Sequence, residues 1–409
     1  MEQNKSKNTL KKIFIIIMVI VIIVGTNLIT FFASSYFLPY LNKESIVVDA
    51  DDKVAIKNIN KLLFLSEELE SSYLWDYNEQ DLWDGAIKGF MDGTGDPYTS
   101  YMDQEDYENY ELSAQTSFGG IGVQITNDEN NNVIINKVFM NYPAHKVGIT
   151  IGDIIVSADE VDLRDMNINK AVTYLRGEKG SKVKIGVLRG NEYLEFEVER
   201  TEVEVINVEH KMLDNNIGYI HILQFEDNSY EQFSKALDAM SKKGMNGLIL
   251  DLRENPGGNV AQSVMIVDEL LGKCEVIYTL DANGEKEYYH SDADKIDIPI
   301  VVLADEYSAS ASEIVVAALV DNDAAEFVGV NTYGKGIMQI YKPMSDGSLY
   351  HYTIMEYFAP SGMKIHGVGI APDYEVEPLE KYKNKLIEEI PFDDDVQLQK
   401  AIEVLTDSF

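Results

Sequence analysis

From about residue 215 onward, short runs of apolar residues alternate with segments whose apolar residues recur at helical spacing. The runs predict buried strands and the segments between them predict helices. The expected strands are 217–223, 248–252, 298–304 and 327–330, and the expected helices are 229–241, 260–271 and 311–320. Strand–helix alternation with continuous apolar strands is typical of a layered α/β fold.

Two polar segments follow directly after expected strands. Arg253–Gly258 follows the strand 248–252, and Glu306–Ser310 follows the strand 298–304. Reactive groups in α/β folds gather at the carboxyl ends of strands. We therefore expect these two segments to lie at the same edge of the sheet and to form the functional site.

Three serines, Ser308, Ser310 and Ser312, alternate with alanines where the helix 311–320 should begin. Ser310 with Glu313 also matches a capping box, S-x-x-E, so this serine could simply cap the helix. A serine at a strand-to-helix junction is equally well placed as a nucleophile, since the N–H of Ala311 can hold a developing oxyanion. The chemistry of the residues leaves the choice among the three serines open.

Lys335 lies between Gly334 and Gly336, with Tyr333 and Ile337 beyond, which favours partial burial. Burial without a carboxylate partner lowers the pKa of a lysine from about 10.4 toward neutrality. A neutral amine next to a serine hydroxyl could take its proton as a general base. If the following segment is helical, the amide of Gln339, four residues on, would face the amine and orient it without adding charge.

Other chemistries fit less well. The segment 329–335 nearly spells a phosphate-binding loop, but Gly336 stands where that loop needs a magnesium-binding hydroxyl. The G-x-S-x-G elbow of a Ser-His-Asp hydrolase is absent, and only His366 stands in a glycine-rich segment of functional character. No pair of histidines has metal-ligand spacing, and the acidic run 393–395 is most simply a solvated face.

Taken together, the polar segments resemble the C-terminal processing peptidases, also called tail-specific proteases. The motifs that carry the resemblance are Asp251-Leu252-Arg253-x-Asn255-Pro256-Gly257-Gly258, Ser308-Ala309-Ser310-Ala311-Ser312-Glu313, Gly334-Lys335-Gly336-x-x-Gln339, Pro360-Ser361-Gly362, Gly367-Val368-Gly369-Ile370-x-Pro372-Asp373 and Gly95-Asp96-Pro97-Tyr98. They occur in the family's order over about residues 50–405. Glu254 departs from the pattern, which has a neutral residue such as asparagine or glycine at that position.

The resemblance implies a serine endopeptidase with a crotonase-like α/β core and no cofactor or metal. It implies Ser310 as the nucleophile, Lys335 as its base and Gln339 as the support of the base. The oxyanion donors would be the N–H of Ala311 and that of Gly257 or Gly258. The alternative function is a catalytically inactive receptor for peptides, in which the protease core is degenerate. The presence of Ser310, Lys335 and Gln339 speaks against that alternative.

Residues 111–200 form a β-rich module, which the same resemblance identifies as an inserted PDZ domain. The segment Phe118-Gly119-Gly120-Ile121-Gly122 resembles its carboxylate-binding loop, because successive glycines let N–H groups converge on an anion. A substrate's C-terminal tail would lie along 122–126 as an added strand, beside a helix from Asn167 to Leu175. Arg176 ends that helix; it could contact substrate or the protease core, or only complement the helix dipole.

The amino terminus predicts the location of the chain. Lysines precede an apolar stretch, so residues 1–12 are an expected cytoplasmic tail and residues 13–35 an expected single transmembrane anchor. The competing interpretation is a cleaved signal peptide, whose cleavage site at 33–35 would be poor. Under either interpretation the catalytic part lies outside the cytoplasm. Residues 44–110 predict a helical region, with Tyr98 and Tyr101 packed as a lid, and residues 201–409 the peptidase core.

Charge and cysteine content limit the partners. The chain has 69 acidic and 34 basic residues, a net charge of −35, so nucleic acid is not an expected ligand. The sole cysteine, Cys274, has apolar neighbours and is expected to be buried, without an internal disulfide. The helices expected at 55–75 and 396–405 are candidates for pairing two copies into a homodimer.

Overall fold

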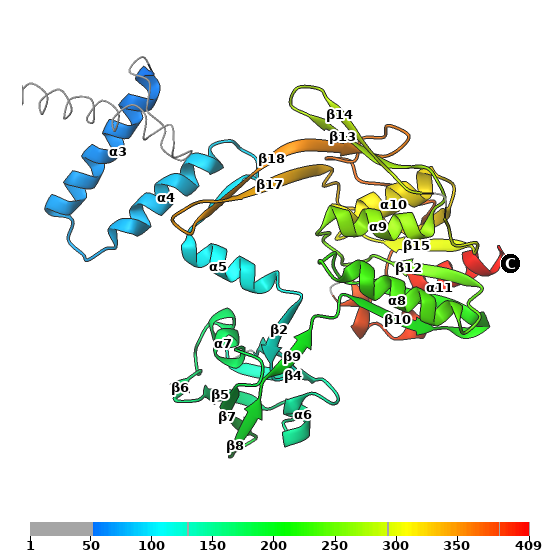
Figure 1. The fold of residues 1–409 in the computed structure, drawn as a ribbon, viewed down its shortest axis with the longest axis horizontal. Helices are drawn as coiled ribbons and strands as arrows, with labels where there is room; N and C mark the ends of the chain where they lie inside the picture. The colour runs from blue at the N-terminus through cyan, green and yellow to red at the C-terminus, as the bar shows by residue number, and fades with distance from the viewer. Residues whose placement is uncertain (1–51, 129–130, 293, 384, 409) are drawn as a thin grey trace, which may run out of the picture. The chain divides into compact units, whose positions relative to one another are not determined.

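The computed structural model describes residues 52–408 except 129–130, 293 and 384 (Figure 1). The chain divides into two compact units, Met1–Gly89 and Phe90–Phe409. In the first unit, α3 (Lys53–Ser72) begins at Asp52, whose carboxylate accepts the N–H of Ala55 at 3.0 Å, and α4 (Glu79–Asp92) follows. This confirms a helical region after residue 52. No described helix has both the length and the apolar character needed to cross a bilayer, and the expected anchor, 13–35, lies outside the described residues.

The α/β core of the second unit is built on a six-stranded sheet. Its order is β10 (Val208–Met212), β11 (Ile217–Ile222), β12 (Gly247–Asp251), β15 (Ile300–Ala304), β16 (Ala325–Gly329) and β19 (Tyr374–Glu375). All neighbouring strands are parallel except β10 and β11. The strands β12 and β15 are buried along their whole length, because helices cover both faces of the sheet.

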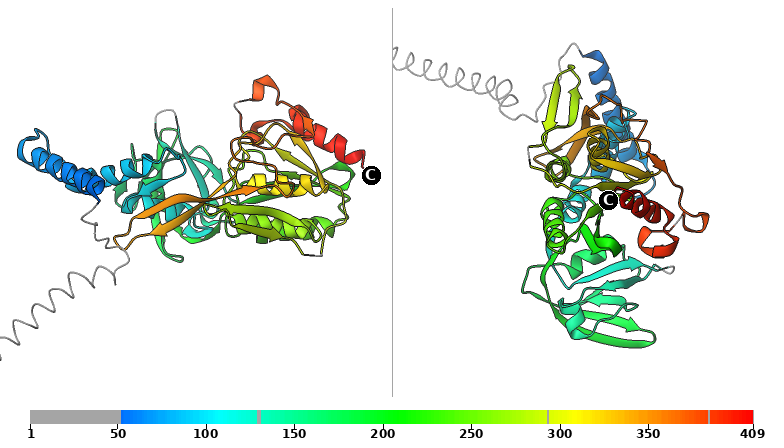
Figure 2. Two further views of the ribbon diagram at one scale, coloured as in Figure 1. Left: turned by 90° about the horizontal axis from the view of Figure 1, so that it is seen from above. Right: turned by 90° about the vertical axis from the view of Figure 1, so that its right-hand side faces the viewer.

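Helices α8 (Ser229–Ser241), α9 (Val260–Leu270) and α10 (Ala311–Asp321) pack on one face of this sheet, and α11 (Val396–Thr406) packs on the other (Figure 2). Leu248 and Leu250 of β12 point into the first layer, whereas Ile249 points into the second. The apolar face of α11 is buried against the sheet, so that face is not exposed for pairing with another copy. Of the two expected dimer segments, α3 keeps its apolar side chains exposed.

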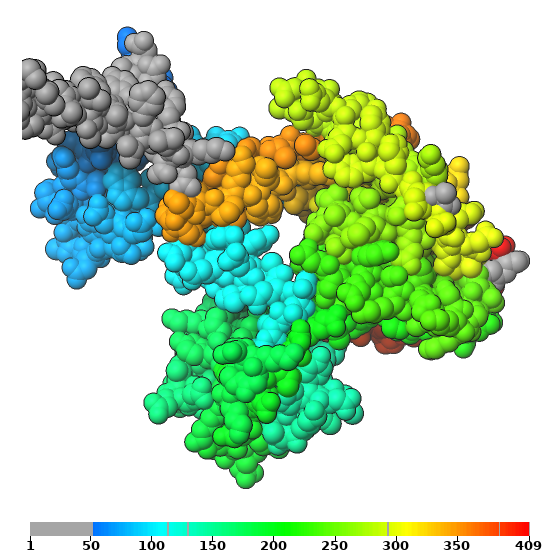
Figure 3. Space-filling view, in the orientation of Figure 1, coloured from blue at the N-terminus to red at the C-terminus, as the bar shows by residue number. Residues whose placement is uncertain are grey.

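A second sheet, which the sequence pattern did not predict, adjoins the core. Its order is β1 (Ser100–Met102), β18 (Leu349–Phe358), β13 (Glu275–Asp281) and β14 (Lys286–His290), and β17 (Ile337–Pro343) also pairs with β18. β17 and β18 form the antiparallel ribbon seen in orange in Figure 3. Through β1, this sheet brings the segment 96–99 next to the residues that precede β17.

The β-rich module has a sheet of order β3 (Val123–Asn127), β4 (Val133–Val138), β5 (Ile154–Ala158), β7 (Lys182–Arg189) and β8 (Glu192–Glu199), with β6 (Val161–Asp162) paired to β5. Helices α6 (Pro143–Val147) and α7 (Ile168–Leu175) complete it, and the side chain of Asn167 caps α7. β2 (Ser117–Gly120) pairs with β9 (Thr201–Glu204), and α5 (Gln104–Ser113) precedes β2.

A buried ionic network joins β12 to the start of α11. Arg253 is 1% exposed; its guanidinium donates to both oxygens of Asp251 and lies 2.9 Å and 3.0 Å from the two oxygens of Asp395. The side-chain oxygen of Gln397 accepts a further bond at 3.0 Å. The guanidinium thus fixes the C-terminal helix to the strand that carries the glycine turn.

We predict that Arg253→Met lowers the free energy of unfolding by about 3–5 kcal/mol, because it leaves two buried carboxylates without their partner. Urea unfolding followed by circular dichroism measures the change. Lys235→Met is the control, since Lys235 forms an exposed pair with Glu231 on α8, and its unfolding midpoint should match that of the parent. Equal midpoints for both variants would contradict the role given to Arg253.

Candidate active site

Ser310 lies at the junction between the loop after β15 and the start of α10. Its backbone has φ 55° and ψ −115°, whereas an ordinary N-cap residue has a negative φ. The neighbouring serines are buried and structural: the hydroxyl of Ser308 donates to the carbonyl of Leu252 at 2.8 Å, and that of Ser312 to the carbonyl of Asn255 at 2.9 Å. The structure therefore separates the three serines, because only Ser310 combines partial exposure with a strained backbone.

The glycine turn after β12 lies against Ser310. A Cβ added to Gly257, which has φ 101°, would be 2.7 Å from Cβ of Ser310 and 2.9 Å from the nitrogen of Ala311, so only glycine fits there. The N–H of Gly257 donates to the side chain of Asn255 at 2.9 Å. Of the two glycines expected as oxyanion donors, Gly257 is therefore nearest to Ser310 but has its N–H engaged. Gly258 pairs with Phe225 as an isolated bridge.

Lys335 lies in the loop between β16 and β17, and its side chain is half-buried. Its Nζ lies 4.5 Å from the centre of the Tyr98 ring. Burial lowers the pKa of Lys335, and the carboxylates of Asp96 and Glu313 oppose this shift without reversing it. Among the residues that the structure describes, no carboxylate oxygen lies within 4.0 Å of this amine. The expected partial burial without an ion pair is thus present.

Glu313 joins the serine loop to the lysine loop. This fully buried carboxylate accepts the N–H of Ser310 at 3.0 Å and that of Lys335 at 2.8 Å on the same oxygen. Its other oxygen accepts the N–H of Gly334 at 2.7 Å and the hydroxyl of Thr332 at 2.6 Å. Burial raises the pKa of Glu313, although these four donors oppose the shift. Because two donors share one oxygen, the backbones of Ser310 and Lys335 lie side by side. From the sequence, Glu313 is recognisable only as part of a capping box and of the serine motif.

The helical segment on which the orienting role of Gln339 was conditional is not present, because residues 337–343 form strand β17. Pairing with β18 holds this segment extended, with a register shift between Met338 and Gln339. The amide of Gln339 donates to the hydroxyl of Thr353 at 3.2 Å, and that hydroxyl donates to Asp96 at 2.7 Å. Gln339 thus supports the carboxylate of Asp96 beside Lys335. Burial alone would raise the pKa of Asp96, but hydrogen bonds from Thr353, Thr99 and Tyr98 together lower it.

A pocket of about 720 Å³ opens beside Lys335. It is lined by Tyr98, Glu254, Pro256, Tyr307, Ala309, Tyr333, Lys335, Lys383, Lys385 and Leu386. The expected lid residue Tyr98 forms part of its wall, and its hydroxyl is 3.3 Å from that of Tyr333. Glu254 also faces this pocket; its N–H donates to Asp305 at 3.0 Å, and its carboxylate accepts the N–H of Ile387 at 3.1 Å. Glu254, the residue that departs from the family pattern, therefore connects the glycine turn to the C-terminal segment.

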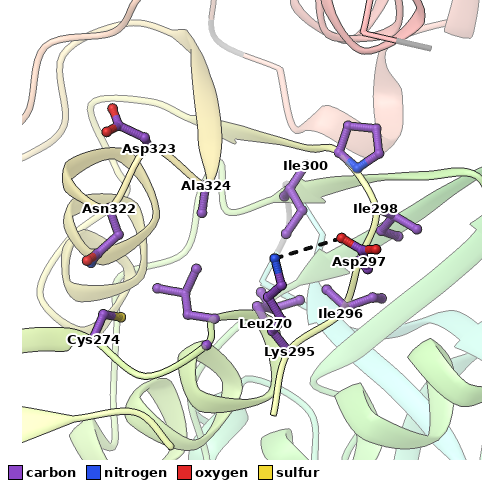
Figure 4. A pocket seen from close by; sticks show the side chains of 13 residues that line it. Leu270, Cys274, Lys295, Ile296, Asp297, Ile298, Ile300, Asn322, Asp323 and Ala324 are labelled. Carbon is purple, nitrogen blue, oxygen red and sulfur yellow. Dashed lines mark ion pairs between the residues drawn. The ribbon is translucent and has the colours of Figure 1, made fainter. Parts of the chain in front are cut away.

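A second pocket, of about 400 Å³, lies beside the ends of α9 and α10 (Figure 4). It contains none of the expected site residues. The amine of Lys295 and the carboxylate of Asp297 are 3.8 Å apart at its edge, and the half-buried Cys274 lies on its wall. The cysteine sulfur is 3.1 Å from the hydroxyl of Ser291, so the cysteine is less completely buried than expected and lies beside a polar group.

In the β-rich module, the expected carboxylate-binding loop is partly a strand. Phe118, Gly119 and Gly120 belong to β2, and Gly122 has φ 80°. Ile121 is buried in the core of the module. Gly119 is close to the carbonyl of Gly177, which accounts for the glycine, since a Cβ there would be 2.0 Å from that oxygen. Among the described strands, β3 pairs only with β4, so its second edge has no strand beside it.

Arg176 links this module to the segment before β2. Its guanidinium donates to the carbonyl of Leu112 at 2.6 Å and lies 3.8 Å from the centre of the Phe118 ring. The buried Nε of Arg176 has no hydrogen-bond partner, and burial lowers the pKa of this residue. Arg176 therefore does more than complement the dipole of α7, because its side chain is packed against a neighbouring segment.

Three family models match the chain. Residues 216–376 match peptidase family S41, residues 119–199 match a PDZ domain, and residues 27–106 match the N-terminal domain of the activating protease CtpB. The first match contains Ser310 and Lys335, and the second contains the β3 edge.

Individual proteins are also similar. The chain is 33% identical to the carboxy-terminal processing protease CtpA of Bacillus subtilis, over 91% of this chain and 78% of that protein. It is 34% identical to CtpB of the same organism, over 77% of this chain and 67% of that protein. Among solved structures, the photosystem II D1 C-terminal processing protease is 26% identical, with a TM-score of 0.47, over 77% of this chain and 86% of that one.

Proposed function

Because this chain belongs to the S41 family of C-terminal processing serine peptidases, which carry a PDZ domain, we propose that Ser310 is its nucleophile and Lys335 its general base. The observation that carries this proposal is the shared carboxylate oxygen of Glu313, which holds the two residues side by side. The half-buried amine without an ion pair supports it, since a base must be neutral to accept a proton.

In the proposed reaction, the amine of Lys335 takes the proton of the Ser310 hydroxyl as the serine oxygen attacks the peptide carbonyl. The N–H of Ala311, at the first turn of α10, stabilises the negative charge that develops on the carbonyl oxygen. Gly258, or Gly257 after release of its N–H from Asn255, would supply the second donor. The protonated lysine then returns the proton to the leaving amine, and water hydrolyses the acyl-enzyme.

We predict that Ser310→Ala and Lys335→Ala each lower the rate of cleavage of an unfolded protein by at least about 1000-fold, because each removes one half of the reacting pair. The circular dichroism spectrum should stay that of the parent. Lys235→Ala, a change on the exposed face of α8, serves as the control and should retain full activity. Substantial turnover by either site variant would remove the pair from the mechanism. A parent chain with no turnover would favour the receptor function.

We further infer that the PDZ domain binds the C-terminal tail of the substrate along the unpaired edge of β3. An extended peptide adds there as a strand, because the edge offers free backbone N–H and C=O groups. Helix α7 lies beside β3, so a peptide added at this edge would have the helix next to it. Gly122, with φ 80°, allows the chain to turn just before this edge.

A substrate peptide with a free terminal carboxylate should be cleaved with a KM at least about tenfold lower than the same peptide with a C-terminal amide. The rate at saturation should be similar, because the groove contributes binding and does not take part in the reaction. Steady-state kinetics on the matched pair of peptides measures both constants. Equal KM values would exclude recognition of the terminal carboxylate.

We also propose that residues 13–35 anchor the chain in the cell membrane with the peptidase outside the cytoplasm, on the strength of the lysines before this apolar stretch. After alkaline carbonate washing, the full chain should remain in the membrane pellet with an unchanged mass. A soluble product shortened near residue 35 would instead favour a cleaved signal peptide.

A further inference from the structure

Two residues outside the Ser310–Lys335 pair contact both of its members. Glu313 holds the two backbone N–H groups, as described above. On the other side, the hydroxyl of Tyr357 lies 2.9 Å from the carbonyl oxygen of Ser310 and 2.6 Å from that of Lys335. A carbonyl oxygen can only accept, so the single hydroxyl proton is shared between them. Tyr357 is 0% exposed, and burial raises its pKa well above the ordinary value, so this hydroxyl keeps its proton.

The two contacts are complementary. Glu313 comes from the first turn of α10 and Tyr357 from β18, and neither is next to Lys335 in sequence. Glu313 accepts hydrogen bonds from the N–H groups of Ser310 and Lys335, and the hydroxyl of Tyr357 donates to the C=O groups of the same two residues. With both in place, the serine loop cannot shift along the lysine loop without breaking hydrogen bonds to two buried groups, which is costly.

We propose that Glu313 and Tyr357 are positioning residues that together hold the hydroxyl of Ser310 in register with the amine of Lys335, and that the charge of Glu313 also acts on this amine. The proposal rests on the function proposed above for Ser310 and Lys335. It assigns neither residue a contact with the substrate.

The negative charge of Glu313 allows an experiment to distinguish its two proposed roles, which are to align the reacting pair and to act electrostatically on the amine of Lys335. Burial lowers the pKa of Lys335, while Asp96 and Glu313 raise it, so removal of the Glu313 charge should lower it further. The titratable groups that act on or contact this amine come from several elements: Asp96 and Tyr98 before β1, Glu313 on α10 and His351 on β18. Further titratable and charged groups share the pocket with Lys335: Glu254, Tyr333, Lys383 and Lys385. The nearby His366 acts on Asp96. Replacement of Tyr357 by phenylalanine changes none of these charges.

The test compares the pH dependence of kcat/KM for the full chain, Glu313→Gln and Tyr357→Phe, with a quenched fluorescent peptide as substrate. Activity needs the neutral amine, so it should rise as the pH increases through the pKa of Lys335. In both variants the plateau should fall by about 10- to 100-fold, because the reacting groups lose their alignment. In Glu313→Gln the rising limb should also move to lower pH, whereas in Tyr357→Phe it should stay in place.

Each outcome decides one point. An unchanged plateau in both variants would overturn the positioning role. A lower plateau with an unmoved limb in Glu313→Gln would overturn the action of its charge on the amine. If Glu313→Gln does not fold, Tyr357→Phe still tests the positioning role, since its ring keeps the packing. Ser310→Ala, measured in parallel, tests the proposed function itself: if it retains activity, the reacting pair is wrong, whereas an inactive Ser310→Ala with unaffected Glu313→Gln contradicts only this inference.

Discussion

The arrangement of the site depends on one buried carboxylate that accepts hydrogen bonds from two different loops. Burying an ionised carboxylate costs free energy unless enough donors replace its hydration. Glu313 has four donors, yet the pKa of its carboxyl is still raised, so the compensation is incomplete. A well-packed apolar residue at this position could fill the same space in the core at a lower cost in free energy. The benefit of the carboxylate is therefore geometric: it fixes which backbone groups lie side by side.

The α/β layers explain why residues far apart in the sequence meet at this point. The loops after β12 and β15, which are adjacent parallel strands, carry the glycine turn and the serine, and the loop after β16 carries the lysine. The three segments thus leave the same edge of the sheet. The second sheet then supplies Tyr357, Thr353 and Gln339 from its paired strands β17 and β18. A mostly parallel sheet and an antiparallel sheet thus both contribute residues to one candidate site.

Local patterns were enough to predict four of the six strands of the core sheet, β11, β12, β15 and β16, together with the helices packed on them. The two outer strands, β10 and β19, were not predicted. Helices α8 and α9 have apolar residues at regular helical spacing. An asparagine directly precedes each of them, Asn228 before α8 and Asn259 before α9. The second sheet was not predictable, because β18 alternates little and is half-buried along most of its length. The strand at Gln339 depends on pairing with β18, and the partners of Arg253 include a residue 142 positions away. Such contacts have no local pattern. The chemistry of the residues left three serines open, and only the family resemblance implied Ser310; the hydrogen bonds that engage Ser308 and Ser312 became visible in the structure.

The unpaired edge of β3 has a consequence for the protein when no peptide is bound to it. An exposed row of backbone donors and acceptors will join any extended chain, including the same strand of another copy. Polar side chains at Gln124, Thr126 and Asn127 make this edge less apolar, and among these positions only Ile125 is an apolar β-branched residue. An unpaired edge of this kind carries a tendency to self-association, which the high negative charge of the chain counteracts by mutual repulsion between copies.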